Sequence, residues 1–273
     1  MFLCETCSHN TRGAFLLSLE ETSSSFYNQR EPLDLTLGLR AELQSAAGME
    51  HTEPTTADVA IAVTSGAGAL MYLFKVHQSP NGLRTTHKTT ATLALALFTA
   101  QRNGMTPLGI KLSLALSLSS LGDYFLAIED TETNFLRGLG SFLMAHLLYI
   151  SMLAPKSSGY EMVTSDLFRT ASFVILASTA PVLNYLMFWR VDPKLRIPIL
   201  VYSAVIFVMF SSALCVEDSV VVRGAVLFTV SDCLLATDRF LLGPESKLAR
   251  PMQYAVWVFY YLGQALLAIG LSE

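Results

Sequence analysis

Eight long apolar runs, separated by short polar breaks, dominate this sequence. They cover residues 57–75, 88–102, 106–128, 133–153, 166–188, 195–216, 220–242 and 253–271. Most reach the roughly 20 residues that a helix needs to cross a ~30 Å hydrocarbon layer. None alternates with the period of two that is typical of barrel strands. Because only helices and closed barrels satisfy their backbone hydrogen bonds in lipid, the runs predict transmembrane helices.

The composition supports a membrane protein over a soluble one. Hydrophobic residues make up 52% of the chain and charged residues only 15%, whereas an average soluble domain is about 25% charged. The formal net charge of −4 also excludes a generic nucleic-acid binder, which would be basic. We therefore expect an all-α, polytopic bundle of eight transmembrane helices embedded in a lipid bilayer.

The chain divides into two unequal parts. Residues 1–56 are polar and rich in serine and threonine, which predicts a disordered or weakly structured N-terminal tail. Residues 57–273 form the predicted eight-helix transmembrane domain. With eight spans, the loops after spans one, three, five and seven share one side. Those loops and span ends carry ten Lys and Arg residues against six on the other side, which places them in the cytosol. We expect an endomembrane, such as the endoplasmic reticulum, rather than the plasma membrane.

Several polar side chains interrupt the apolar runs. Asp123 and Asp232 are the most costly, because a carboxylate at mid-helix costs roughly 2.5–3.5 kcal/mol on insertion scales. His146 and Gln264 also lie in mid-span. At 1.5 Å of rise per residue, Asp123 and Asp232 lie ~8 and ~14 Å from the odd-numbered loops, and His146 and Gln264 lie deeper, at ~16–20 Å. We expect them to line a polar cavity that opens to that side.

Each of these residues also has a plain structural explanation. A buried aspartate often forms a hydrogen bond to a neighbouring helix. His146 could be a core histidine whose hydrogen bonds are all made within the protein. Gln264 and Asn184 could form hydrogen bonds between helices. Lys88 could be a lysine at a helix end whose side chain extends to place its ammonium group at the membrane surface. Two acids at similar depth are harder to explain in this way, because paired carboxyl groups in different environments can act as an acid and a base. The common motifs of serine hydrolases, zinc proteases and nucleotide-binding proteins are not found.

The sequence resembles the YhhN family, which includes the lysoplasmalogenases. The matching segments are 119–123, 138–142 leading to His146 and Tyr149, 198–202, 224–232 leading to Arg239, and 260–264. The resemblance covers about residues 57–273. It departs from the family pattern at Lys88, which is followed by Thr89 where the family usually has proline.

The resemblance implies hydrolysis of the vinyl-ether bond of a lysoplasmalogen to a fatty aldehyde and glycerophosphocholine or glycerophosphoethanolamine. Protonation of the double bond would give an oxocarbenium-like cation, to which water adds. This chemistry needs a proton donor and a carboxylate, but no cofactor and no metal. The predicted catalytic residues are Asp123 and Asp232 as the acid–base pair, with His146 as a hydrogen-bond partner or proton relay.

The substrate would be a single-chain lysophospholipid, with its tail in an apolar groove and its phosphate held by a basic side chain. The predicted substrate-binding residues are Arg239, Lys88, Tyr149, Tyr202 and Gln264.

Two other functions stay open from the residues alone. A proton-coupled membrane transporter could use the same intramembrane aspartates as a relay, although no internal duplication is evident. A non-catalytic membrane organiser would use the acids only to hold helices together. Assembly into a homo-oligomer is also left open.

Overall fold

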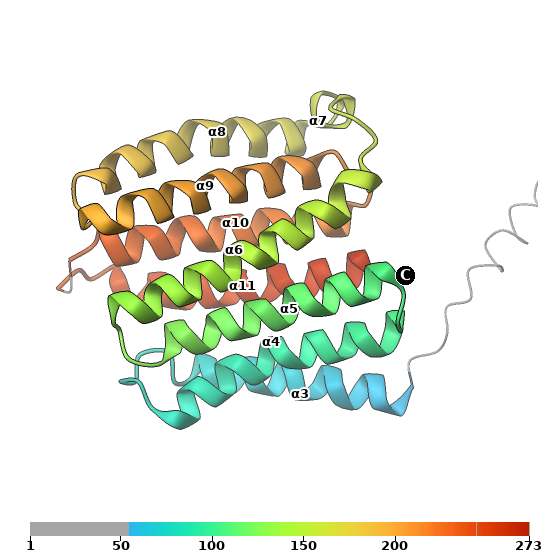
Figure 1. Cartoon of the computed structure of the whole chain (residues 1–273), viewed down its shortest axis with the longest axis horizontal. Coiled ribbons are helices and arrows are strands. Elements are labelled where there is room, and N and C mark those ends of the chain that lie inside the picture. The colour runs from blue at the N-terminus through green and yellow to red at the C-terminus, as the bar shows by residue number, and fades with distance from the viewer. Residues whose placement is uncertain (1–54, 244, 273) are drawn as a thin grey trace, which may run out of the picture. The chain divides into compact units, whose positions relative to one another are not determined.

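The computed structural model describes residues 55–243 and 245–272, and this part of the chain is all α-helical (Figure 1). Of the predicted disordered tail, residues 1–54 lie outside the described residues. The long helices are α3 (Thr56–Leu73), α4 (Gly82–Asn103), α5 (Pro107–Ala127), α6 (Glu132–Leu153), α8 (Leu167–Phe188), α9 (Pro193–Leu214), α10 (Ser219–Phe240) and α11 (Ala249–Leu271). A 3₁₀ turn (Ala154–Lys156) and the short α7 (Glu161–Ser165) connect α6 to α8.

Each predicted apolar run corresponds to one long helix, and local capping sets where the helices begin. The second helix begins at Gly82 rather than at Lys88, because the side chain of Asn81 accepts a hydrogen bond from the backbone N–H of Arg84. Asp166 caps α8 in the same way. The extra turns of α4 are polar, and for this reason hydropathy alone places its start too late.

Six of the long helices, α3, α6, α8, α9, α10 and α11, are long and apolar enough to cross a membrane by length and composition. The expectation of eight such helices is therefore met only in part, since α4 and α5 are not among the six. Both carry many hydroxyl groups and two charged residues within the predicted apolar run, Lys88 and Arg102 in α4 and Lys111 and Asp123 in α5. Mean hydropathy falls because of these residues, whichever way their side chains face.

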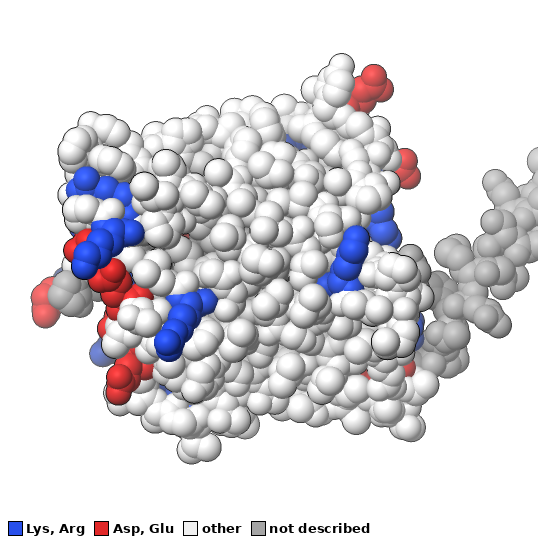
Figure 2. All heavy atoms as spheres, in the orientation of Figure 1, with Lys and Arg blue, Asp and Glu red and all other residues white. Residues whose placement is uncertain are grey.

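The long helices lie side by side and alternate in direction, so that the loops α3–α4, α5–α6, α8–α9 and α10–α11 share one end, on the left in Figure 1. We call this the odd-loop end. Consecutive helices pack against each other in the pairs α3–α4, α4–α5, α5–α6 and α10–α11, and α6 also packs against α9. Figure 2 shows the charged side chains of one face gathered toward the two ends of the helices, with an almost uncharged surface between them.

Glycine allows α10 and α11 to approach closely. A Cβ atom at Gly263 would lie 2.7 Å from the backbone nitrogen of Phe228, and one at Gly224 would lie 2.9 Å from the backbone nitrogen of Leu267. Small residues at such crossings are the usual means of bringing membrane helices into contact. This contact sets the position of α10, which carries Asp232.

We expect Gly263→Ala to lower stability by about 1–3 kcal/mol, because the added methyl group must displace the backbone of α10. The measurement is thermal unfolding in detergent. Gly140→Ala in α6 is the matched control, since its Cβ would meet nothing within 4 Å. Equal melting temperatures for the two variants would contradict the close contact.

Candidate functional site

Asp232 lies where α6, α9 and α10 converge. The hydroxyl group of Tyr202 on α9 donates a hydrogen bond of 3.1 Å to Oδ2 of Asp232. Nε2 of His146 on α6 is 3.6 Å from the same oxygen and 3.3 Å from the Tyr202 hydroxyl. Asp232 is eight residues before the end of α10, which puts it about 12 Å from the odd-loop end of the helix. These three residues form one polar cluster, which we call the Asp232 cluster.

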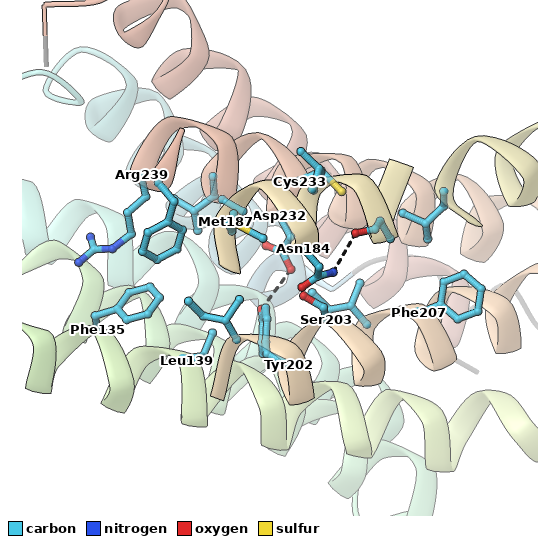
Figure 3. Close-up of a pocket in the computed structure, with 18 residues that line it drawn as sticks. Phe135, Leu139, Asn184, Met187, Tyr202, Ser203, Phe207, Asp232, Cys233 and Arg239 are labelled. Carbon is cyan, nitrogen blue, oxygen red and sulfur yellow. Dashed lines mark hydrogen bonds between the residues drawn. The ribbon is translucent and has the colours of Figure 1, made fainter. Parts of the chain in front are cut away.

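A pocket of about 720 Å³, including its mouth, opens beside this cluster (Figure 3). Its walls come from α6, α8, α9 and α10 and are mostly aliphatic or aromatic. The side chains among its lining that carry a hydrogen-bonding group or a thiol are Asn184, Tyr202, Ser203, Asp232, Cys233 and Arg239. Asp232 is the single carboxylate in this lining, and its side chain is 12% exposed. The pocket therefore presents one carboxyl group within apolar walls.

The pocket has a basic end and an apolar end. Arg239, in the last turn of α10, lies at the odd-loop end, where its guanidinium is 4.3 Å from the centre of the Phe135 ring. It also pairs with the exposed Asp130 at 2.7 Å. Phe207 lies at the other end of the view in Figure 3, with Asp232 between the two. An amphipathic ligand would place its charged group at Arg239 and its apolar part toward Phe207.

Asp123 belongs to a different cluster. Its Oδ2 accepts hydrogen bonds from the Tyr260 hydroxyl at 2.6 Å and the Thr92 hydroxyl at 2.7 Å, and its Oδ1 is 3.2 Å from Nζ of Lys88. Its side chain is 1% exposed, and it does not line the pocket. These contacts connect α4, α5 and α11. We call this set the Asp123 cluster.

The two aspartates do not face each other in one cavity, contrary to expectation. Phe228 lies against both clusters, with its ring centre 4.9 Å from that of His146 and 5.6 Å from that of Tyr260. Asp123 is occupied by three partners of its own, whereas Asp232 faces the pocket. The structure therefore separates the two acids into one buried cluster and one pocket cluster.

The other predicted substrate-binding residues divide in the same way. Tyr202 and Arg239 line the pocket, but Lys88, Tyr149 and Gln264 do not. The hydroxyl of Tyr149 donates a 2.7 Å hydrogen bond to Oε1 of Gln264, and both side chains are fully buried. This bond links α6 to α11 and gives these two residues a structural contact instead of access to the pocket.

Two pocket residues with an amide or hydroxyl side chain are absent from the predicted binding residues. Asn184 on α8 was interpreted as a contact between helices, and Ser203 on α9 was not singled out. The only sequence signal for Ser203 is its place directly after Tyr202. Serine is common in membrane helices, and its orientation depends on how the helix is rotated, so the sequence does not distinguish a pocket serine from any other.

Comparison with known proteins agrees with the predicted resemblance. The chain is 34% identical over 160 residues to "Lysoplasmalogenase" of Mycobacterium bovis, which covers 57% of this chain and 58% of that protein. It is 31% identical over 170 residues to "Lysoplasmalogenase TMEM86B" of Sus scrofa, which covers 60% of this chain and 64% of that protein. The matches thus span about three fifths of the length of these relatives. No solved structure matches the chain.

The sequence model of the YhhN family matches residues 83–271, which include both the Asp232 cluster and the Asp123 cluster. That range takes in seven of the eight long helices almost completely, five of which are long and apolar enough to cross a membrane. With α3 there are six such helices. This chain is therefore an integral, multi-pass membrane protein that belongs to the YhhN family.

Proposed function

We propose that this protein is a membrane hydrolase that cleaves the vinyl-ether bond of lysoplasmalogens. The observation that carries the proposal is the single carboxyl group of Asp232 in an apolar pocket with Arg239 at its odd-loop end. The pocket matches the order of groups in a lysolipid, which has a phosphate, then the ether, then an alkyl chain. The names of the curated relatives support the same substrate.

In the proposed reaction, the carboxylic acid form of Asp232 gives its proton to the outer carbon of the double bond. The ether oxygen and the adjacent carbon then share the positive charge, which the new carboxylate stabilises. Water adds to that carbon and returns a proton to Asp232, which restores the acid. In the resulting hemiacetal, the hydroxyl proton passes to the glycerol oxygen as the bond between that oxygen and the carbon breaks. This step releases a fatty aldehyde and glycerophosphocholine or glycerophosphoethanolamine. One carboxyl group thus serves first as acid and then as base.

The neighbours of Asp232 would orient it for these steps. The Tyr202 hydroxyl donates a hydrogen bond to Oδ2 of Asp232, so Oδ1 would be the oxygen that carries the proton and gives it to the substrate. His146 is fully buried, and its Nε2 is close to both partners, so it can hold Tyr202 in place or exchange a proton with Asp232. We assign Tyr202 and His146 as positioning residues. Asp123, in its own cluster, would stabilise the packing of α4, α5 and α11 and would not contact the substrate.

We also propose that α4 and α5 cross the membrane with the other six long helices. Their polar side chains are largely turned into the protein, since Thr92, Ser119 and Asp123 are almost completely buried. In this arrangement the low mean hydropathy of the two helices is compatible with lipid. The result is an eight-span bundle.

The function is tested with purified protein in detergent and a lysoplasmalogen, with release of fatty aldehyde as the measurement. We expect turnover without any ion gradient, since detergent abolishes gradients. A matched lysophospholipid with an ester in place of the vinyl ether is the control and should give no aldehyde. Transport of the lysolipid across liposome membranes without product would instead favour a carrier.

Cys233 provides a second test of where the substrate lies, because this free cysteine lines the pocket directly after Asp232. We expect a maleimide reagent to block turnover in the native protein, and lysolipid to slow that inactivation. Cys233→Ser is the control and should be insensitive to the reagent. Equal inactivation of Cys233→Ser would place the reaction at another cysteine, such as Cys215, and a Cys233 that lysolipid does not protect would contradict binding in the pocket.

A further inference from the structure

Asn184 and Ser203 are two polar side chains in the pocket that keep hydrogen-bonding capacity for a ligand. The amide nitrogen of Asn184 donates to the carbonyl oxygen of Ala180, one turn earlier on α8, at 2.9 Å. Its oxygen Oδ1 has no hydrogen-bond donor among the described residues. Because the nitrogen is held within the helix, Oδ1 is the atom available to a ligand, and it can only accept a hydrogen bond.

Ser203 differs from other serines on the same helix. Ser211 and Ser212 donate to the backbone carbonyl groups four residues earlier, at 2.7 and 2.8 Å, as serines in membrane helices commonly do. Ser203 makes no such bond and has no hydrogen-bond partner among the described residues. Its hydroxyl group can both donate and accept.

These two groups come from different helices and lie together in the pocket next to the Tyr202–Asp232 pair (Figure 3). The surrounding walls are apolar, so a polar ligand group that enters must find its hydrogen bonds there or lose them. An acceptor beside a hydroxyl is the arrangement that binds an alcohol, which donates to one and accepts from the other. A group without a hydroxyl hydrogen would leave Oδ1 of Asn184 unpaired.

We propose that Asn184 and Ser203 form a subsite for a free hydroxyl group of the lipid, next to the bond that is cleaved. The inference rests on the proposed function, in which that hydroxyl is the one on the central glycerol carbon of a lysolipid. This hydroxyl is two carbons from the ether oxygen, so a substrate positioned at Asp232 carries it into the same part of the pocket. A lipid with a second acyl chain at that carbon has no hydrogen to donate to Asn184. The subsite therefore selects single-chain lipids over two-chain lipids.

The experiment compares two substrates that differ only in this hydroxyl. One is a lysoplasmalogen, and the other is the same vinyl ether built on propane-1,3-diol. We expect kcat/KM of the native protein to favour the hydroxyl substrate by about tenfold to a hundredfold, because the analogue without the hydroxyl loses two neutral hydrogen bonds. Ser203→Ala and Asn184→Leu should each reduce this preference severalfold, and the double variant should nearly abolish it. Ser203→Thr, which keeps a hydroxyl, should retain most of it.

Ser211→Ala is the matched control, because Ser211 is on the same helix but bonds its own backbone and does not line the pocket. It should leave the preference unchanged. A native protein that turns over both substrates equally would overturn the proposal. So would variants that slow both substrates by the same factor, since a purely structural role predicts that result.

A binding measurement keeps this inference separate from the hydrolase proposal. A saturated alkyl-ether lysolipid, which cannot be cleaved by this chemistry, should protect Cys233 from maleimide at a concentration about tenfold lower than its analogue without the hydroxyl. In the Asn184→Leu/Ser203→Ala double variant the two lipids should protect equally. If no aldehyde is ever released but this difference is found, the subsite stands and the reaction is wrong. Equal protection in the native protein overturns the subsite.

Discussion

Asp232→Asn should reduce fatty aldehyde release by about 10³-fold or more while the protein still inserts and folds. General acid–base catalysis contributes typically 10²–10⁴-fold, and in this pocket the same carboxyl group also stabilises the cation. Asparagine has almost the same volume and can still accept the Tyr202 hydrogen bond, so packing around the pocket should be preserved. The measurement is aldehyde release in detergent, at matched protein concentration.

The matched control for this substitution is Asp238→Asn on the same helix. Asp238 accepts a hydrogen bond from Gln253 and does not line the pocket, so its amide variant should keep near-normal turnover. Full activity in Asp232→Asn would contradict the assignment of the proton donor. Protection of Cys233 by lysolipid should persist in Asp232→Asn, since the carboxyl group is needed for the reaction more than for binding.

Removal of one member of the Lys88–Asp123 pair should have a large effect of another kind. Asp123→Asn or Lys88→Met alone should destabilise the protein by about 3–5 kcal/mol, because each leaves an unpaired charge in a nearly dry part of the bundle. The double variant Lys88→Met/Asp123→Asn removes both charges and should recover much of the stability, since replacement of a buried ion pair is often close to neutral. Thermal unfolding in detergent measures all four proteins.

The activity of the double variant decides between two roles for Asp123. If Asp123 only holds α4, α5 and α11 together, the folded double variant should release aldehyde at a rate within about tenfold of the native protein. A double variant that is as stable as the native protein but inactive would show that Asp123 takes part in the chemistry. That result would restore the acid–base pair predicted from the sequence and would require Phe228 to move during turnover.

The sequence-based interpretation was most successful for properties that depend on nearby residues. The positions of the long helices follow from apolar runs, since burial of a helix in lipid depends on its own composition. The interior position of both aspartates follows from the cost of placing a carboxylate in hydrocarbon, which depends on the segment alone. The YhhN resemblance was confirmed, and it covers the residues of both clusters.

The partners of those residues depend on how each helix is rotated and which helices pack together. Asp123 accepts a hydrogen bond from Tyr260, which is 137 positions later in the chain, and Tyr202 on α9 donates one to Asp232 on α10. The sequence indicates how deep a residue lies along its helix, but two residues at the same depth can face opposite directions. For this reason depth placed the two acids together, while the structure assigns one to the pocket and the other to a buried ion pair.

A multi-helix membrane protein with two interior carboxyl groups could be predicted from the residues alone, because hydropathy and the cost of burying charge are properties of single segments. The packing of the helices was needed to show that Asp232 faces a pocket with Arg239, Asn184 and Ser203, whereas Lys88, Thr92 and Tyr260 surround Asp123. The physical reason is that a helix has many faces. Packing against neighbouring helices, including the close approach at Gly224 and Gly263, determines which face of a helix is turned toward the pocket and therefore which side chains reach it.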